Sequence, residues 1–223
     1  NEDLGGGYRA IFTLESRIEA DTGGLGSRPI SGNRLPDRLS TATSLGLPAA
    51  LQPAVSAVAA QIGSSVGVNL NGSFFDRQIF SGLVTPYGAF TLGRQYTPAY
   101  QASAYFDVMK TESSLALGQL VAIPASFDIR VSNSLQYGLQ LGGLTATAMY
   151  AAGEVAGKPS ARRLLGAMAI YKGNGYSFGG GANTRNNELG EKSLTTVTVG
   201  ATVDVGPGTL SGQYATIKDD HPT

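Results

Sequence analysis

The sequence predicts an all-β protein, an antiparallel up-and-down β-barrel whose strands cross a membrane. Three observations carry this prediction. Apolar and polar residues alternate in segments of about ten residues. Short turns alternate with long connections, and the apolar faces of the segments end in tyrosine.

About nine strands follow from the alternation. The first reads YRAIFTLESR, with Phe12 and Leu14 on one face and Arg9 and Glu15 on the other. In order, the expected strands span about residues 7–18, 73–84, 88–96, 127–138, 142–151, 162–172, 175–184, 194–205 and 208–218.

The connections between these strands are of two kinds. Short ones carry turn-forming residues, as at Gly142-Gly143 and at Gly206-Pro207-Gly208. Long ones of about 55, 30, 10 and 10 residues separate the other strands. A barrel with tight turns at one end and loops at the other produces this alternation.

The polar faces of the strands bear on the class of barrel. A soluble sandwich or lipocalin-like barrel would carry Lys and Glu on its outer face. Here the polar faces consist of Thr, Ser, Gln, Gly and isolated Arg. Tyrosines at strand ends fit the headgroup layer of a membrane, although tyrosines at the rim of an ordinary β-core remain an alternative. The tyrosines concerned are Tyr8, Tyr137, Tyr150, Tyr171 and Tyr214.

Composition excludes several functions. The 223 residues include 16 basic and 16 acidic side chains, so charge gives no case for binding nucleic acid. Cysteine is absent and His221 is the single histidine, which leaves almost no material for a metal site or for histidine catalysis. Neither a phosphate-binding loop nor a nucleophile paired with a base is visible. We therefore expect no cofactor and no enzymatic activity.

Five blocks of sequence resemble the general porins of Gram-negative bacteria, especially those of the β-proteobacterial type. They are NEDLGGGYRAIFTLES, DRQIFSGL, YGAFTLGRQYTPAY, RVSNSLQYG and VGATVDVGPGTLSGQYATIKDD, in that order. The resemblance spans nearly the whole chain and implies a homotrimer in the bacterial outer membrane, in contact with its lipid. Each subunit would be a transmembrane antiparallel barrel of about 16 strands, so residues 1–223 would be a single barrel domain that is incomplete at both ends.

The resemblance also implies a role for the stretch TLGRQYTPAYQASAYFDVMKTE. In these porins the loop after the GRQ strand folds into the lumen and narrows it. On that mapping residues 96–125 form the constriction loop, with Asp107 and Glu112 as its acidic groups. Basic residues of the facing wall would be Arg9, Arg77, Arg94 and Arg130. Opposite charges across a narrow aqueous passage orient solutes and select ions by sign, and clustered arginines favour anions.

Strand alternation supports three of these arginines. Arg9 and Arg130 fall on the polar faces of alternating strands and are expected to face the lumen. Arg77 does so if Phe80 faces lipid. The plainer interpretation is that each arginine is a solvated or salt-bridged charge at a strand end, and that the two acidic residues lie in an exposed loop.

Arg94 conflicts with strict alternation, because Phe90 and Leu92 share its parity in the segment FTLGR. A β-bulge near Gly93 would shift the register and turn Arg94 toward the lumen.

Residues 21–72 form an insertion that departs from the usual length of the family, and we expect a long extracellular loop. Its alanine-rich part between Pro48 and Gly63 favours a short helix. A latch to a neighbouring subunit and a plain surface loop are both compatible with this composition.

The expected function is passive diffusion of small hydrophilic solutes and ions through a water-filled outer-membrane channel, with a preference for anions. One alternative is a structural barrel or adhesin whose extracellular loops bind a partner. A third class, a soluble ligand-binding barrel, predicts a monomer that needs no detergent.

Overall fold

The computed structural model describes residues 1–16, 18, 20, 41–66, 74, 75, 77–110 and 128–220. The chain divides into two compact units. The larger contains Asn1–Leu14 and Gln78–Thr223, and the smaller contains Glu15–Arg77.

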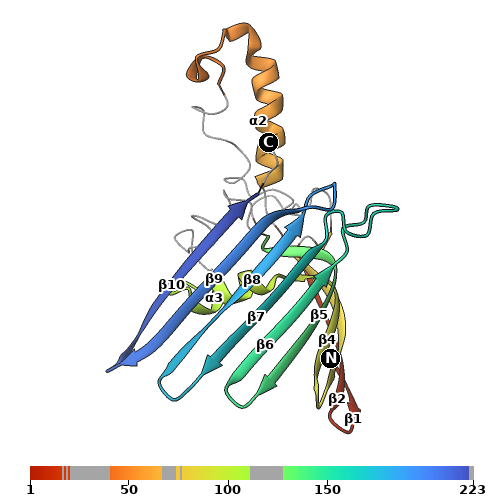
Figure 1. Ribbon diagram of the computed structural model, residues 1–223, viewed down its shortest axis with the longest axis vertical. Coiled ribbons are helices and arrows are strands. Elements are labelled where there is room, and N and C mark those ends of the chain that lie inside the picture. The colour runs from red at the N-terminus through yellow and green to blue at the C-terminus, as the bar shows by residue number, and fades with distance from the viewer. Residues whose placement is uncertain are drawn as a thin grey trace. The chain divides into compact units, whose positions relative to one another are not determined.

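The larger unit is built on one antiparallel sheet whose strands follow each other in chain order (Figure 1). Its ten strands are β1 (Glu2–Gly5), β2 (Tyr8–Glu15), β3 (Gln78–Thr85), β4 (Gly88–Tyr96), β5 (Arg130–Leu141), β6 (Leu144–Ala151), β7 (Leu164–Lys172), β8 (Tyr176–Asn186), β9 (Lys192–Val205) and β10 (Gly208–Asp219). The predicted up-and-down order is confirmed. β1 and β10 are the two edges of this open sheet.

The number of strands differs from the prediction by one, because β1 was not expected. Its four residues, EDLG, are too few to show an alternation. The strand nevertheless pairs with β2, placing Glu2 opposite Ala10. A turn at Gly6 and Gly7 joins the two, with φ of 62° and 82°, a conformation that glycine adopts without strain.

The predicted tight turns lie together at one end of the sheet (Figure 1). The β9–β10 hairpin shows how local sequence sets the register. Its pairing runs without a shift from Leu194 opposite Asp219 to Val205 opposite Gly208, where the Gly206-Pro207 turn closes it.

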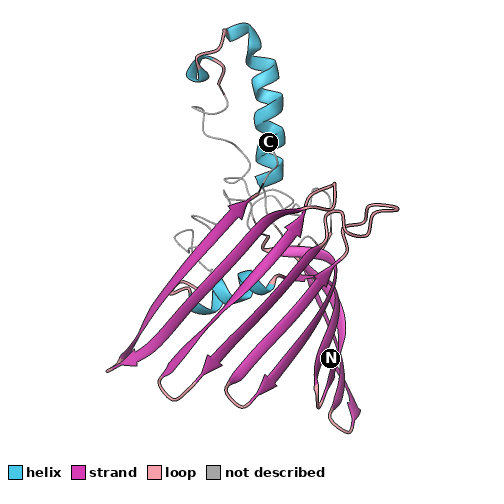
Figure 2. Cartoon of the chain, in the orientation of Figure 1, coloured by secondary structure: helices cyan, strands magenta, loops and turns pink. Residues whose placement is uncertain are grey.

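Helix α3 (Pro98–Phe106) lies against one face of the sheet, which we call the inner face (Figure 2). The helix begins after Thr97, whose side-chain oxygen accepts a hydrogen bond from the backbone N–H of Tyr100. A threonine cap followed by proline is a favourable start for a helix. Ala102 and Phe106 bury themselves against Met168 and Ile170 of β7.

The opposite face of the sheet, the outer face, carries exposed apolar side chains. They include Phe12, Leu92, Leu135, Tyr150, Leu165, Tyr171, Val199, Leu210 and Tyr214. The buried core therefore lies between α3 and the inner face, and the outer face is left apolar. A sheet that meets lipid on the outside has this distribution.

The smaller unit contains the predicted alanine-rich helix. Two short 3-10 turns, η1 (Thr43–Leu45) and η2 (Ala49–Leu51), precede α2 (Gln52–Val66). Gln52 ties the segment together, since its Oε1 accepts from the N–H of Ala42 at 2.8 Å and its Nε2 donates to Ser56. No helix in the described part of the chain has the length and apolarity needed to cross a membrane.

Candidate functional site

Hydrogen bonds fix α3 on the inner face of the sheet. The backbone N–H of Ala99 donates to Oδ1 of Asn183 on β8 at 3.2 Å. One turn later, the Ser103 hydroxyl donates to Gln213 on β10 at 3.2 Å. Because these partners come from two separate strands, the helix is held across the wall rather than at one point.

Gln101 ties the same helix to β4 and β5. Its side-chain amide donates to the carbonyl of Tyr96 at 2.9 Å and to Oε1 of Gln136 at 3.1 Å. The orientation of α3 is thus set from both sides, and the groups that it exposes have defined positions.

Three glycines of the wall let the helix come close. A Cβ at Gly166 would lie 2.9 Å from Cδ of Pro98, and one at Gly181 would lie 2.5 Å from the Pro98 carbonyl oxygen. A Cβ at Gly200 would lie 2.4 Å from Cγ of Phe106. Real Cβ atoms do not approach other atoms this closely, so larger residues on β7, β8 and β9 would push α3 away from the wall.

The segment that returns to β5 is anchored beside the start of α3. The N–H of Thr97 donates to the carbonyl of Ile129 at 3.0 Å. Its hydroxyl donates to the carbonyl of Asp128 at 2.5 Å. The carboxylate of Asp128 accepts from Arg185 of β8 at 2.6 Å. Burial raises the pKa of Asp128, and the Arg185 guanidinium offsets part of this effect.

Arg130 stands at the same place, where β5 begins. Its NH2 group donates to the hydroxyl of Tyr96 at 2.8 Å, and its guanidinium carbon lies 4.5 Å from the centre of the Tyr96 ring. That ring stacks on Tyr100 of α3. Among the described residues the buried Nε of Arg130 has no hydrogen-bond partner. A stacked arginine with a spare donor is a suitable ligand for an anion.

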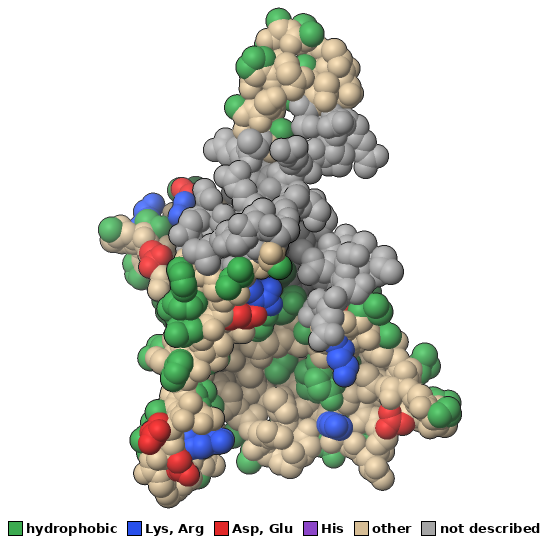
Figure 3. Space-filling view, turned by 180° about the vertical axis from the view of Figure 1, so that it is seen from behind, with side chains coloured by type: hydrophobic (Ala, Val, Ile, Leu, Met, Phe, Trp, Pro, Cys, Tyr) green, Lys and Arg blue, Asp and Glu red, His purple; other side chains and the backbone are tan. Residues whose placement is uncertain are grey.

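Asp107 and three other charged residues surround a cavity of about 610 Å³ between the end of α3 and the wall. Asp107 caps α3, is 8% exposed and accepts from the N–H of Met109 at 3.1 Å. Lys110 lies on the loop, and Lys172 and Asp204 belong to β7 and β9. In Figure 3 the inner face is a hollow whose surface is mostly uncharged and carries a few charged side chains.

Arg94 keeps the strand alternation that places it on the outer face of the sheet. The predicted irregularity exists, but it shifts the pairing of β4 with β5 between Gly93 and Gln95. Pairing with β3 stays regular, with Ile79 opposite Arg94. Gln95 remains on the inner face, where it donates to the hydroxyl of Ser134 at 3.1 Å. Arg94 therefore keeps the face of its neighbour Leu92, and its NH1 donates to Ser132.

The remaining predicted residues are distributed as follows. Arg9 is exposed on β2 next to the Gly6-Gly7 turn, opposite Asp3 of β1. Arg77 forms an ion pair with Glu15 within the smaller unit. Glu112 lies outside the described residues.

Sequence reasoning missed Lys172 and Arg185 on the wall. The alternation of β7 and β8 contained the signal, because Lys172 shares the parity of Ile170 and Arg185 that of Asn183. The alternation does not give the position of α3. That position decides which residues of the inner face lie near the helix.

The sequence as a whole matches the family model described as Gram-negative porin, over residues 1–223. No curated protein sequence matches the chain.

Several solved structures are similar to this chain, and the first one named below shares its fold. An anion-selective porin from Comamonas acidovorans is 23% identical with a TM-score of 0.59, and the match covers 98% of this chain and 56% of that one. OmpT of Vibrio cholerae is 18% identical, with 66% of this chain and 49% of that one covered and a TM-score of 0.47. Its in-vitro folded trimer form is 16% identical, with coverages of 70% and 52% and a TM-score of 0.47. The chain thus spans little more than half the length of the porin from Comamonas acidovorans.

Proposed function

The chain belongs to the Gram-negative porin family of the bacterial outer membrane, and from this premise we propose that the complete protein is a water-filled channel. Small hydrophilic solutes and ions diffuse through it passively, with a preference for anions. Residues 1–223 supply part of one barrel domain, and residues 96–125 form its constriction loop.

The position of α3 carries this proposal. The helix lies on the inner face, tied to Asn183 and Gln213, while the outer face is apolar and exposed. A wall that is apolar outside, polar inside and narrowed by its own chain suits a pore that passes water-soluble molecules and limits their size.

The positive charge of Arg130 beside the start of α3 supports a preference for anions. We assign Arg9 and Arg130 to the positive side of the filter and Asp107 and Glu112 to its acidic side. Arg130 has a spare buried donor beside the start of α3. In a narrow passage with low-dielectric walls such a cation raises the local concentration of anions. The similar porin from Comamonas acidovorans is itself anion-selective.

Two of the predicted arginines are left out of this filter. Arg77 is already paired with the carboxylate of Glu15. In the pairing of β4 with β3, Arg94 lies on the same outer face as Leu92.

We further propose that the protein is a homotrimer embedded in outer-membrane lipid and that residues 21–72 form a long extracellular loop. The apolar outer face supports both contacts, since it offers surface to lipid and to a neighbouring subunit.

Recordings of single channels in planar bilayers test the proposed function. Stepwise increases of current in salt solution are expected. A protein that inserts into the bilayer without conducting would favour the alternative of a structural barrel or adhesin.

A further inference from the structure

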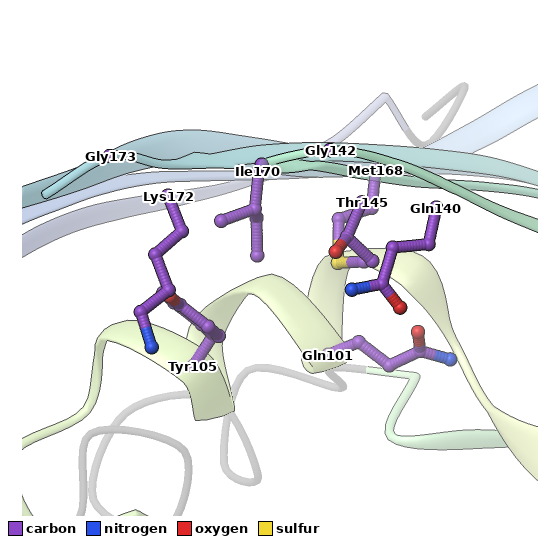
Figure 4. A pocket seen from close by; sticks show the side chains of 10 residues that line it. Gln101, Tyr105, Gln140, Gly142, Thr145, Met168, Ile170, Lys172 and Gly173 are labelled. Carbon is purple, nitrogen blue, oxygen red and sulfur yellow. The ribbon is translucent and has the colours of Figure 1, made fainter.

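A second cavity, of about 540 Å³, lies between α3 and the inner face, on the side of the tight turns. Figure 4 shows its side chains. The lining residues are Gln101, Tyr105, Gln140, Gly142, Gly143, Thr145, Met168, Ile170, Lys172 and Gly173. Cavities of this size hold small organic molecules.

Charged, apolar and uncharged polar side chains occupy different parts of the lining. Gln140, Thr145 and Ile170 stand in one row across β5, β6 and β7, because the registers pair Gln140 with Thr145 and Thr145 with Ile170. In Figure 4 Lys172 lies on one side of Ile170, and Thr145 and Gln140 lie on the other. An ammonium group is thus separated from an amide and a hydroxyl by an apolar strip.

The apolar strip is a fixed surface. Met168 and Ile170 are 7% and 4% exposed, and both pack on α3. Tyr105 reaches toward the cavity from the helix on the opposite side (Figure 4). The parts of Met168 and Ile170 that remain exposed and the side chain of Tyr105 are the apolar lining of the cavity.

Lys172 is the charged residue of this lining, and no carboxylate belongs to it. Among the described residues the Lys172 ammonium makes neither an ion pair nor a hydrogen bond. An exposed ammonium without a carboxylate partner favours an anionic group at this end of the cavity.

The other end offers uncharged hydrogen-bonding groups. In the described part of the chain, the Gln140 side-chain amide has no partner. Gln101 uses its N–H groups on Tyr96 and Gln136, and its Oε1 accepts no bond from the described residues. This end suits a hydroxyl or amide group rather than a second charge.

We propose that this cavity is a binding station for small organic monocarboxylates with an apolar body and a distal hydrogen-bonding group. The carboxylate meets Lys172, the body lies on Ile170 and Met168, and the distal group bonds Gln140. The inference rests on the proposed function, because a solute reaches the cavity through the lumen. The inference names a class of solute for the channel and adds Lys172 to the residues of the proposed filter.

4-Hydroxybenzoate is the test solute, because it has all three parts. We would measure its reduction of the chloride current through the complete protein in planar bilayers, and its binding to detergent-solubilised protein by ligand-observed NMR. Lys172→Gln is expected to weaken both effects roughly tenfold, the loss of one charge-assisted hydrogen bond. Lys172→Arg should retain most of the binding. Lys158→Gln, which removes an exposed loop lysine, is the matched control.

Benzoate, which lacks the distal hydroxyl, and 4-hydroxybenzyl alcohol, which lacks the carboxylate, should both bind more weakly than 4-hydroxybenzoate. Equal binding to the wild-type protein and to Lys172→Gln would overturn the inference, even if the channel prefers anions. A channel without current would count against the proposed function, whereas NMR binding that depends on Lys172 would still support the station.

Discussion

Gly200 of β9 lies directly against the ring of Phe106, so closely that a Cβ on the glycine would stand 2.4 Å from Cγ of the ring. The distance between α3 and the wall is therefore set by the absence of a side chain on β9. In a pore, that distance also decides how far the helix reaches into the water-filled passage.

Replacing Gly200 by leucine should narrow the channel. The new side chain cannot share the space of Phe106, so α3 must move toward the pore axis or lose its packing, at a cost of about 1–3 kcal/mol in the free energy of unfolding. We expect a lower single-channel conductance. Gly212→Leu on β10 is the control, since nothing lies within 4 Å of a Cβ there. Equal conductance of the two variants would contradict this role of Gly200.

Thr97 should stabilise the constriction loop through its hydroxyl. The hydroxyl oxygen accepts a hydrogen bond from the N–H of Tyr100 at the start of α3, and the hydroxyl group donates one to the carbonyl of Asp128. Thr97→Val keeps the shape and removes both bonds, so unfolding in urea should become easier by about 1–2 kcal/mol. Thr97→Ser should restore most of the loss. A valine variant as stable as the wild type would disprove the capping role.

Asp128 should make stability depend on pH in an unusual direction. Burial raises its pKa above the ordinary value of 3.8, with Arg185 opposing the shift. The folded state therefore binds the proton more tightly than the unfolded chain. This contribution to stability is complete below 3.8 and is lost as the pH rises through the raised pKa.

Asp128→Asn removes that dependence. The free energy of unfolding of this variant, relative to the wild type, should therefore increase with pH across that window. Urea titrations at several pH values measure it. A difference that stays constant or decreases would show that the Arg185 ion pair outweighs burial.

Arg9 and Arg130 should set the sign of selectivity together. Replacing both by alanine removes two positive charges from the proposed filter, and we expect anion preference to weaken while the barrel still folds. Arg162→Ala is the control, because this arginine pairs with Glu188 on exposed loops, where charges are screened by salt. Unchanged selectivity in the double variant would remove these two arginines from the filter.

Much of the sheet could be predicted from the sequence, because strand alternation and glycine turns are local signals. β1 escaped because EDLG is too short to alternate. Helix α3 escaped as well, although the pair Thr97-Pro98 is a helix start. For this stretch the family resemblance implied a constriction loop, and no helix was expected in it.

The candidate site was harder to predict, because alternation tells which face a residue takes but not what stands opposite. Arg94 shows the limit: a shift near Gly93 was foreseen, yet it affected the pairing with β5 and left the β3 register intact. Lys172 lay on a predicted strand, but it lines a cavity only together with residues of α3, which come from a distant part of the sequence.

The reversal potential of the open channel, with potassium chloride more concentrated on one side of a bilayer, tests the central claim most directly. An anion-preferring pore gives a potential of the sign set by chloride, and we expect this sign for the wild-type protein. A potential of zero, or one of the sign set by potassium, would contradict the account of a channel that prefers anions.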